Sequence, residues 1–172
     1  MKTELHRASF SAAGFRFAIV VSHWNEALTS KLADGAVEAI YEAGADPESI
    51  EIFRVPGSFE LPVACLKAAQ TGDFDAVIAL GVVIRGDTPH FNYVAGQAAE
   101  GIMQASMQTG VPVLFGVITA NDLEQAEQRA GEKSDNKGYE AALSAVEMVN
   151  LFSGFNSRKL QGRGDKALPN VV

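Results

Sequence analysis

Short runs of apolar residues alternate along the chain with longer stretches in which apolar residues recur every three or four positions. The short runs are rich in β-branched residues and are bounded by glycine or polar residues, which is typical of buried strands. The longer stretches are typical of amphipathic helices. This pattern predicts strands at 17–21, 50–55, 76–84 and 113–118, and helices at 25–43, 60–70, 89–109, 121–130 and 137–152.

Strands that are continuously apolar, each followed by a helix, favour a parallel sheet covered on both faces. The predicted fold is therefore α/β: a three-layer sandwich with a four-stranded parallel, flavodoxin-like sheet flanked by helices on both faces. We expect one domain at 15–153. Residues 1–14 form an N-terminal segment that is a candidate for pairing with a neighbouring subunit, and residues 154–172, which lack apolar periodicity, are predicted to form a mobile tail.

Composition narrows the class of protein. The 172 residues carry a net charge of −7, and nucleic acid is not expected as a partner because its binding needs a basic face. No apolar run reaches the length of a membrane span, and the start of the chain has no apolar signal core. Cys65, the only cysteine, lies in an apolar helical stretch and is predicted to be a buried hydrophobe. These features favour a cytoplasmic protein.

Polar segments follow each predicted strand, at the edge of a parallel sheet where such folds bind ligands. Trp24, after the first strand, is placed either to stack on a flat heterocycle or to pack at the rim. Glu60 is either a favourable charge at a helix start or an acceptor for hydroxyls and amines. The three histidines and the cysteine lack metal-ligand spacing, so no metal is expected.

The run 81–90 joins a strand end to a helix start. Thr88 suits an N-cap and Pro89 suits the first helical position. The free N–H groups of such a helix start attract anions, and His90 would carry protons beside the anion. The alternative is a glycine turn with a solvated histidine.

A second polar cluster lies between the last two helices. Asn121 and Glu124 resemble a capping box that opens the helix at 121–130. The loop at 129–138 then places Arg129, Lys133 and Lys137 within nine residues. This loop either binds an anion or is a solvated connection between helices.

Three segments together resemble the lumazine synthase family, which catalyses the penultimate step of riboflavin biosynthesis. They occur in the family's order and spacing, and the resemblance spans about residues 15–151: Arg54-Val55-Pro56-Gly57-Ser58-Phe59-Glu60-Leu61-Pro62, the run 81–90, and Gln128-Arg129-Ala130-Gly131 with Asn136-Lys137-Gly138. The resemblance implies a transferase that condenses 5-amino-6-(D-ribitylamino)uracil with 3,4-dihydroxy-2-butanone 4-phosphate. The products would be 6,7-dimethyl-8-ribityllumazine, phosphate and water, and no cofactor is implied.

The resemblance also assigns residues to this reaction. His90 matches the position that transfers protons, and Asp87 and Thr88 match the phosphate-binding positions. The amine substrate is assigned to Trp24, Ser58, Phe59, Glu60 and the backbone groups of Val82, Val83 and Ile84. The neighbouring subunit is expected to supply Phe115, Arg129 and Lys133. Lys137 and Glu140 lie nearby in the sequence, and Glu140 matches a position where an acidic residue could orient His90.

A site shared between subunits implies a homo-oligomer. The family's homopentamer is the expected unit, and the sequence leaves open whether pentamers assemble into decamers or icosahedral capsids. Riboflavin synthase is a candidate partner.

Two other functions remain: a riboflavin synthase of archaeal type, disfavoured because the loop at 86–90 is complete, and an inactive flavin- or lumazine-binding module or shell protein. The second is disfavoured by the presence of both His90 and Arg129.

Overall fold

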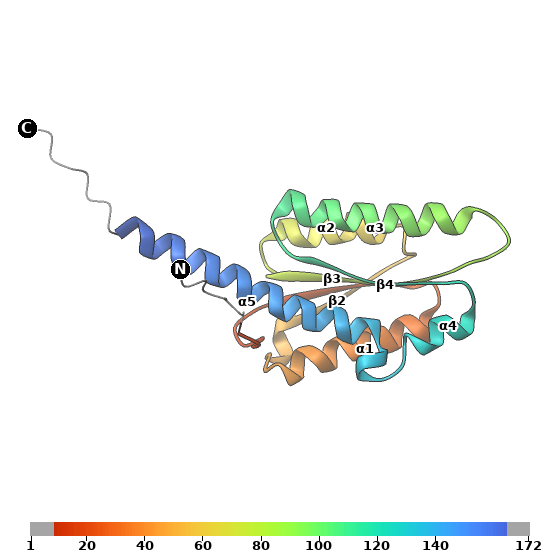
Figure 1. Ribbon diagram of the computed structural model, residues 1–172, viewed down its shortest axis with the longest axis horizontal. Helices are drawn as coiled ribbons and strands as arrows, with labels where there is room; N and C mark the ends of the chain where they lie inside the picture. Colours follow the sequence, from red (N-terminus) through yellow and green to blue (C-terminus); the bar gives the residue numbers. More distant parts are fainter. Residues whose placement is uncertain (1–8, 165–172) are drawn as a thin grey trace, which may run out of the picture.

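A computed structural model describes residues 9–164, in which a parallel sheet of four strands lies between two layers of helices (Figure 1). The strand order is β2-β1-β3-β4. The elements are β1 (Phe17–Ser22), α1 (Glu26–Glu42), η1 (Pro47–Ser49), β2 (Ile50–Val55), α2 (Leu61–Thr71), β3 (Ala76–Ile84), α3 (His90–Thr109), β4 (Val113–Ala120), α4 (Leu123–Gln128), η2 (Lys133–Asp135) and α5 (Lys137–Gly164). The predicted three-layer, flavodoxin-like α/β sandwich is therefore confirmed.

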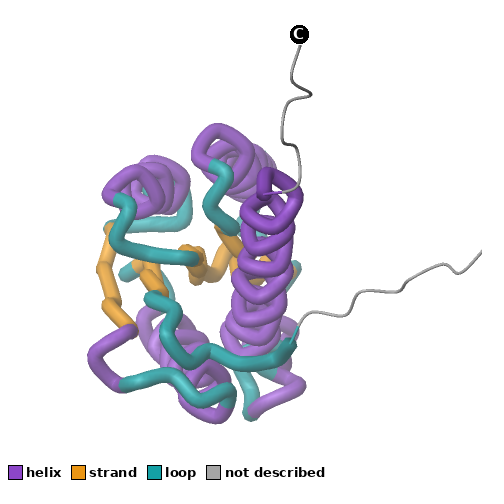
Figure 2. Tube along the Cα trace, turned by 90° about the vertical axis from the view of Figure 1, so that its left-hand side faces the viewer, coloured by secondary structure: helices purple, strands orange, loops and turns teal. Residues whose placement is uncertain are grey.

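Side chains alternate along the central strands and build one core on each face of the sheet. Ile19 and Ile78 are buried in the core that α1 and α5 cover. Val20 and Val77 are buried on the opposite face, in the core that α2 and α3 cover. Figure 2 shows the strands enclosed between these two layers of helices.

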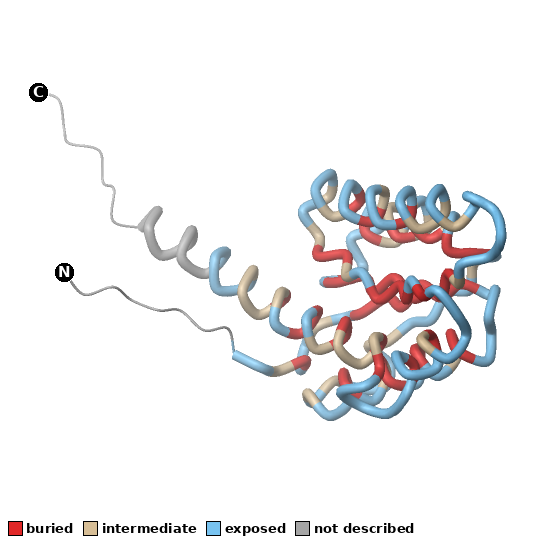
Figure 3. The backbone as a smooth tube through the Cα atoms, turned by 45° about the vertical axis from the view of Figure 1, so that its right-hand side comes forward, coloured by how far each residue is buried: buried red, intermediate tan, exposed pale blue. Residues whose placement is uncertain are grey.

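The two central strands are more buried than the edge strand β2. Figure 3 shows buried residues gathered in the middle of the sheet, between the helices. β1 is buried along its whole length, and β3 is buried up to Val83. β2 has no fully buried residue, and its Ile52 and Phe53 are exposed. A single chain therefore leaves apolar side chains of its edge strand uncovered.

Two predicted helix caps are wrong by one residue. The residue that precedes α3 is Pro89, and no side chain caps this helix, whereas Thr88 was expected to do so. Pro89 already has helical backbone angles, φ −63° and ψ −4°, because its ring fixes φ, and its C=O accepts from Asn92. At α4 the cap is Asp122, whose carboxylate accepts from the N–H of Gln125 at 2.8 Å, in place of the predicted Asn121.

α5 continues to Gly164, beyond the end predicted near residue 152 (Figure 1). The prediction relied on an apolar face, but extending a formed helix requires only residues of adequate helix propensity. The predicted tail at 154–172 therefore begins as helix, and its residues 165–172 lie outside the described part of the chain.

The described part of the N-terminal segment packs on its own chain. Asn150 of α5 donates to the Ser11 carbonyl at 2.8 Å, and the Ala12 N–H donates to the Ala43 carbonyl at 2.8 Å. Residues 1–8, on which the predicted pairing with a neighbour also falls, lie outside the described residues. Among the described helices, none combines the length and apolar character needed to span a bilayer.

Candidate functional site

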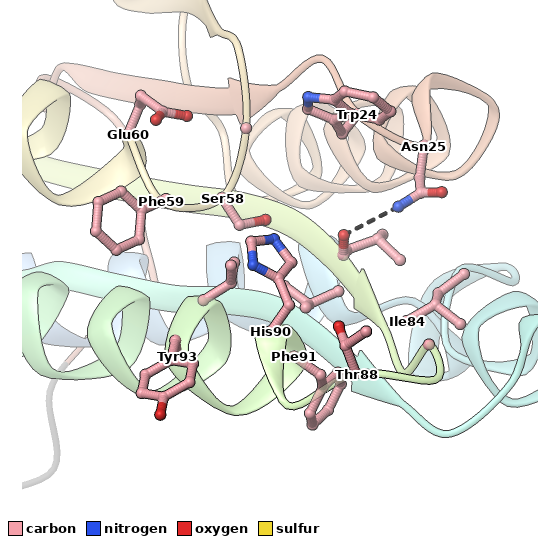
Figure 4. Close-up of a pocket in the computed structure, with 15 residues that line it drawn as sticks. Trp24, Asn25, Ser58, Phe59, Glu60, Ile84, Thr88, His90, Phe91 and Tyr93 are labelled. Carbon is pink, nitrogen blue, oxygen red and sulfur yellow. Dashed lines mark hydrogen bonds between the residues drawn. The ribbon is translucent and has the colours of Figure 1, made fainter.

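A pocket of about 660 Å³ lies at the carboxyl edge of the sheet, between the ends of β1 and β3 and the starts of α2 and α3 (Figure 4). Its lining residues are Trp24, Asn25, Gly57, Ser58, Phe59, Glu60, Val82, Val83, Ile84, Gly86, Thr88, His90, Phe91, Tyr93 and Val94. The pocket thus gathers nine of the predicted site residues from three separate segments of the sequence.

One side of the pocket floor is backbone, because β3 extends further than its neighbour β1. β3 pairs with β4 up to Ile84, but its pairing with β1 ends at Leu80. Successive residues of a strand direct their N–H and C=O groups to opposite neighbours, so alternate residues beyond Leu80 face the strand-free edge. Asn25, in a left-handed conformation with φ 61°, donates from its side chain to the Val82 carbonyl at 3.1 Å across this edge.

Trp24 and Glu60 form one wall of the pocket and converge on Gly57. The position that a Cβ on Gly57 would occupy lies 3.1 Å from Glu60 Oε2 and 3.2 Å from Trp24 Cδ1. A side chain at residue 57 would therefore crowd both Trp24 and Glu60 and require them to shift by a few tenths of an ångström. Trp24 is 72% exposed, so its ring is free to stack on a ligand.

Two buried hydroxyls, those of Ser22 and Ser58, lie near β3 at this end of the sheet. Ser58 is 5% exposed and Ser22 is fully buried, and neither hydroxyl has a hydrogen-bond partner within residues 9–164. Both oxygens lie beside Gly81, at 2.5 and 3.2 Å from the position of its absent Cβ. In Figure 4 the Ser58 hydroxyl and the His90 ring both point into the pocket. Because a buried, unpaired hydroxyl is costly, Ser58 is ready to bond a polar ligand.

The start of α3 closes the other side of the pocket. His90 is the first residue of this 20-residue helix and is exposed. The free N–H groups of the first turn and the helix dipole favour an anion here. Arg85, the nearest cation along the chain, is held away because it donates to Asn121 at 3.1 Å and lies over the Phe91 ring, 4.2 Å from its centroid.

A second hollow, of about 330 Å³, lies beside α4 and the start of α5 and shares no residue with the pocket. It is lined by Gln128, Arg129, Ser134, Asp135, Lys137 and Glu140. Lys137 and Glu140 form an ion pair within it, and Arg129 Nη1 donates to the Gln125 carbonyl at 2.8 Å. Phe115 is 46% exposed on the edge strand β4. Glu140 and His90 therefore belong to different cavities of one chain.

Lys133 lines neither cavity. Its Nζ lies 2.7 Å from Glu42 Oε1 and 3.6 Å from Glu38 Oε1, both on α1. Tyr139 donates its phenolic O–H to the other oxygen of Glu42 at 2.6 Å. These bonds lower the pKa of Glu42, since Lys133 and then Tyr139 stabilise its carboxylate, and the same carboxylate raises the pKa of Lys133.

Cys65 is fully buried in α2, as predicted from its apolar surroundings. Burial raises the pKa of its thiol to about 12, which leaves the thiolate unpopulated at neutral pH. Cys65 is therefore a packing residue of the core.

Comparison with known proteins shows the family of the chain. The model of the family described as 6,7-dimethyl-8-ribityllumazine synthase matches residues 14–153. The chain belongs to the lumazine synthase family. It is 52% identical over 152 residues to the 6,7-dimethyl-8-ribityllumazine synthase of Chlorobium chlorochromatii, covering 88% of this chain and 98% of that protein. It is 51% identical over 156 residues to the enzyme of the same name from Thermus thermophilus, covering 91% and 99%.

Several residues that line this pocket were not predicted from the sequence. Asn25 is the main one, since its bond to Val82 depends on how far β3 extends past β1. Phe91 and Val94 have the spacing of core residues, and they are only partly buried because they also line the pocket. Tyr93 lies on the exposed side of α3, and no sequence pattern distinguishes it from other surface residues of that helix. Asp87, which was predicted, lies in the loop next to the pocket without lining it.

Proposed function

We infer that this chain is a 6,7-dimethyl-8-ribityllumazine synthase, which condenses 5-amino-6-(D-ribitylamino)uracil with 3,4-dihydroxy-2-butanone 4-phosphate and releases phosphate and water. The family membership and two relatives about half identical along nearly their whole length support this function. The observation that carries it is the pocket itself, where a stacking surface, a strand-free backbone edge and a helix N-terminus with a histidine meet.

The amine substrate fits the wall and floor of the pocket. We assign the uracil ring to stacking on Trp24 and to the backbone of Val82 and Ile84, which faces the strand-free edge, with Val83 between them in the lining of the pocket. We assign the ribityl hydroxyls to Ser58 and Glu60, with Phe59 alongside. The unpaired hydroxyl of Ser58 supports this assignment.

The phosphate substrate needs a cation that the pocket does not contain. No lysine or arginine is among the lining residues, and the N–H groups next to Asp87 and Thr88 supply only partial charge. Arg129 and Lys137 both line the second hollow, and Phe115 is exposed on the edge strand β4. We propose that this edge of a neighbouring copy completes the pocket, so that Arg129 binds the phosphate and Glu140 approaches His90.

His90 is proposed to move protons during the reaction. The amine attacks the ketone carbon, and water leaves as the imine forms. Loss of the phosphate group then requires a proton to be removed from carbon, and ring closure with dehydration requires further proton transfers. A histidine changes charge near neutral pH and suits these steps. Fixed donors and Arg129 would stabilise the departing phosphate.

The family implies oligomerisation, and exposed apolar side chains on β2 and α3 are consistent with burial in an assembly. The homopentamer is the proposed unit, and riboflavin synthase, which consumes the lumazine product, is the proposed partner. A cytoplasmic location is also proposed, since the one cysteine is a free buried thiol.

The function is tested by mixing the purified protein with both substrates and recording lumazine absorbance. We expect product from the wild-type protein, a loss of about 10²–10⁴-fold in kcat for His90→Ala, and a raised KM for the phosphate substrate in Arg129→Ala. When lumazine is supplied in place of the two substrates, its consumption would identify a riboflavin synthase. Binding of lumazine without turnover of active substrates would identify a binding or shell protein. Wild-type kinetics in His90→Ala would remove the role of that residue.

A further inference from the structure

Arg129 and Lys137 are held side by side at the base of a closed loop. The N–H of Lys137 donates to the carbonyl of Arg129 at 2.9 Å, so the two residues form the neck of the loop at 129–138. Within the loop, Gly131 donates to the carbonyl of Asp135 at 3.0 Å, and Ala130 pairs with Asn136 as an antiparallel bridge. We call residues 129–138 the cation loop. Its shape holds the backbones of Arg129 and Lys137 side by side.

One anchor ties the cation loop to the middle of α1. Asn136 is 2% exposed and uses its whole amide, because Nδ2 donates to the carbonyls of Lys31 and Gly131. Its Oδ1 accepts from the N–H groups of Gly138 and Tyr139. This anchor joins the loop, the start of α5 and α1.

A second anchor ties the tip of the loop to the end of α1. Lys133 has a φ of 45°, a left-handed conformation that non-glycine residues seldom adopt, and its ammonium group reaches back to Glu42 and Glu38. Glu42 in turn accepts from Tyr139 of α5. One carboxylate thus joins the tip of the loop to the helix that carries Lys137.

We propose that Lys133 is a positioning residue, which holds the cation loop against α1 through Glu42 so that Arg129 reaches the phosphate of a neighbouring site. The proposal rests on the proposed function, and it differs from the sequence-based expectation that Lys133 binds substrate. Lys133 does not line the hollow that contains the other two cations. To reach a phosphate it would have to leave both carboxylates.

The two roles predict opposite effects of removing the carboxylates. If Lys133 positions the loop, then Lys133→Met and the pair Glu38→Gln/Glu42→Gln both loosen the loop. Each variant should then raise KM for the phosphate substrate about two- to fivefold, a size typical of exposed ion pairs, and leave KM for the amine substrate unchanged. Combining all three substitutions should add little, because they break one network. If Lys133 contacts the phosphate, freeing it from Glu38 and Glu42 leaves KM unchanged or lowers it.

Steady-state kinetics on the intact enzyme, varying one substrate at a time, separates these outcomes. Glu51→Gln is the matched control, because it removes a surface ion pair of similar exposure, Arg16–Glu51 at 2.8 Å, that lies outside the cation loop. A large effect of Lys133→Met together with no effect of Glu38→Gln/Glu42→Gln would overturn the proposal, and so would wild-type KM in both variants.

Hydrogen exchange of residues 129–138 gives a readout that is independent of turnover. Exchange should be faster in Lys133→Met and in Glu38→Gln/Glu42→Gln than in the wild type, and unchanged in Glu51→Gln. A wild-type protein that makes no lumazine would refute the proposed function, while exchange would still decide whether Lys133 orders the loop. Equal exchange in all variants would refute the anchor.

Discussion

Gly138→Ala should destabilise the protein strongly because α5 begins almost in contact with the backbone of α1. The position of a Cβ on Gly138 lies 2.0 Å from the Leu32 carbonyl oxygen, 2.7 Å from its carbonyl carbon and 2.9 Å from its Cα. Favourable non-bonded contacts between heavy atoms lie near 3.5–4.0 Å. All three obstructing atoms are backbone, so no side-chain rotation can relieve the clash, and the two helices must separate.

The expected cost follows from this geometry. Overpacking a core costs about 1–3 kcal/mol when side chains can adjust, and a clash with helix backbone belongs at the upper end of that range. A gain of about 0.5–1 kcal/mol in helix propensity offsets part of it. We expect a net loss of about 2 kcal/mol or more in the free energy of unfolding.

Gly154→Ala is the matched control in the same helix. No atom lies within 4 Å of its absent Cβ, so only the gain in helix propensity remains. This variant should therefore be more stable by about 0.5–1 kcal/mol. Denaturant unfolding of both variants at one protein concentration measures the difference, since stability of an oligomer depends on concentration. Equal stabilities for the two variants would refute the close packing of α1 and α5.

Two further predictions concern ionisable groups. Cys65 should resist Ellman's reagent in the native protein and react fully in denaturant, because its thiol is buried with a pKa of about 12; rapid native labelling would contradict this. The stability that the Lys133–Glu42 ion pair gives to the cation loop should depend on pH. Glu42 has a lowered pKa, so its contribution is present above its ordinary value of 4.5 and is lost as pH falls through the lower folded value. Lys133 has a raised pKa, so its contribution is present below its ordinary value of 10.5 and is lost as pH rises through the higher folded value. The local stability of residues 129–138, measured by hydrogen exchange and corrected for intrinsic rates, should be constant between these values and fall outside them. A fall near pH 7 would contradict the assignment.

The sequence predicted the elements well because their signals are local. The bounds predicted for β2 and β3 agree with the structure, since each run of largely apolar residues ends at a loop that contains glycine and proline. The pocket was predicted in outline for the same reason, because parallel strands carry Ser58, Glu60 and His90 to one edge wherever each strand stops. Periodicity therefore determined both the layers and the position of the site.

Features that depend on long-range contacts were not predictable. The bond from Asn25 to Val82 requires knowing that β3 extends past β1, and the pairing of Lys133 with Glu42 joins residues 91 positions apart. The cap of α3 failed for a different reason. Thr88 and Pro89 are both good helix-start residues, and only the backbone angles decide which of them precedes the helix.

We propose that each complete site combines the pocket with His90 from one copy of the chain and the hollow with Arg129 from another. The most direct test uses hybrids of two impaired variants, His90→Ala and Arg129→Ala, co-expressed with different tags and purified through both. In a random hybrid, about one quarter of the interfaces pair an intact pocket with an intact Arg129 edge. We predict that kcat/KM of the hybrid recovers to about one quarter of the wild-type value, far above that of either variant alone. A hybrid no more active than the average of its two parents would contradict the shared site.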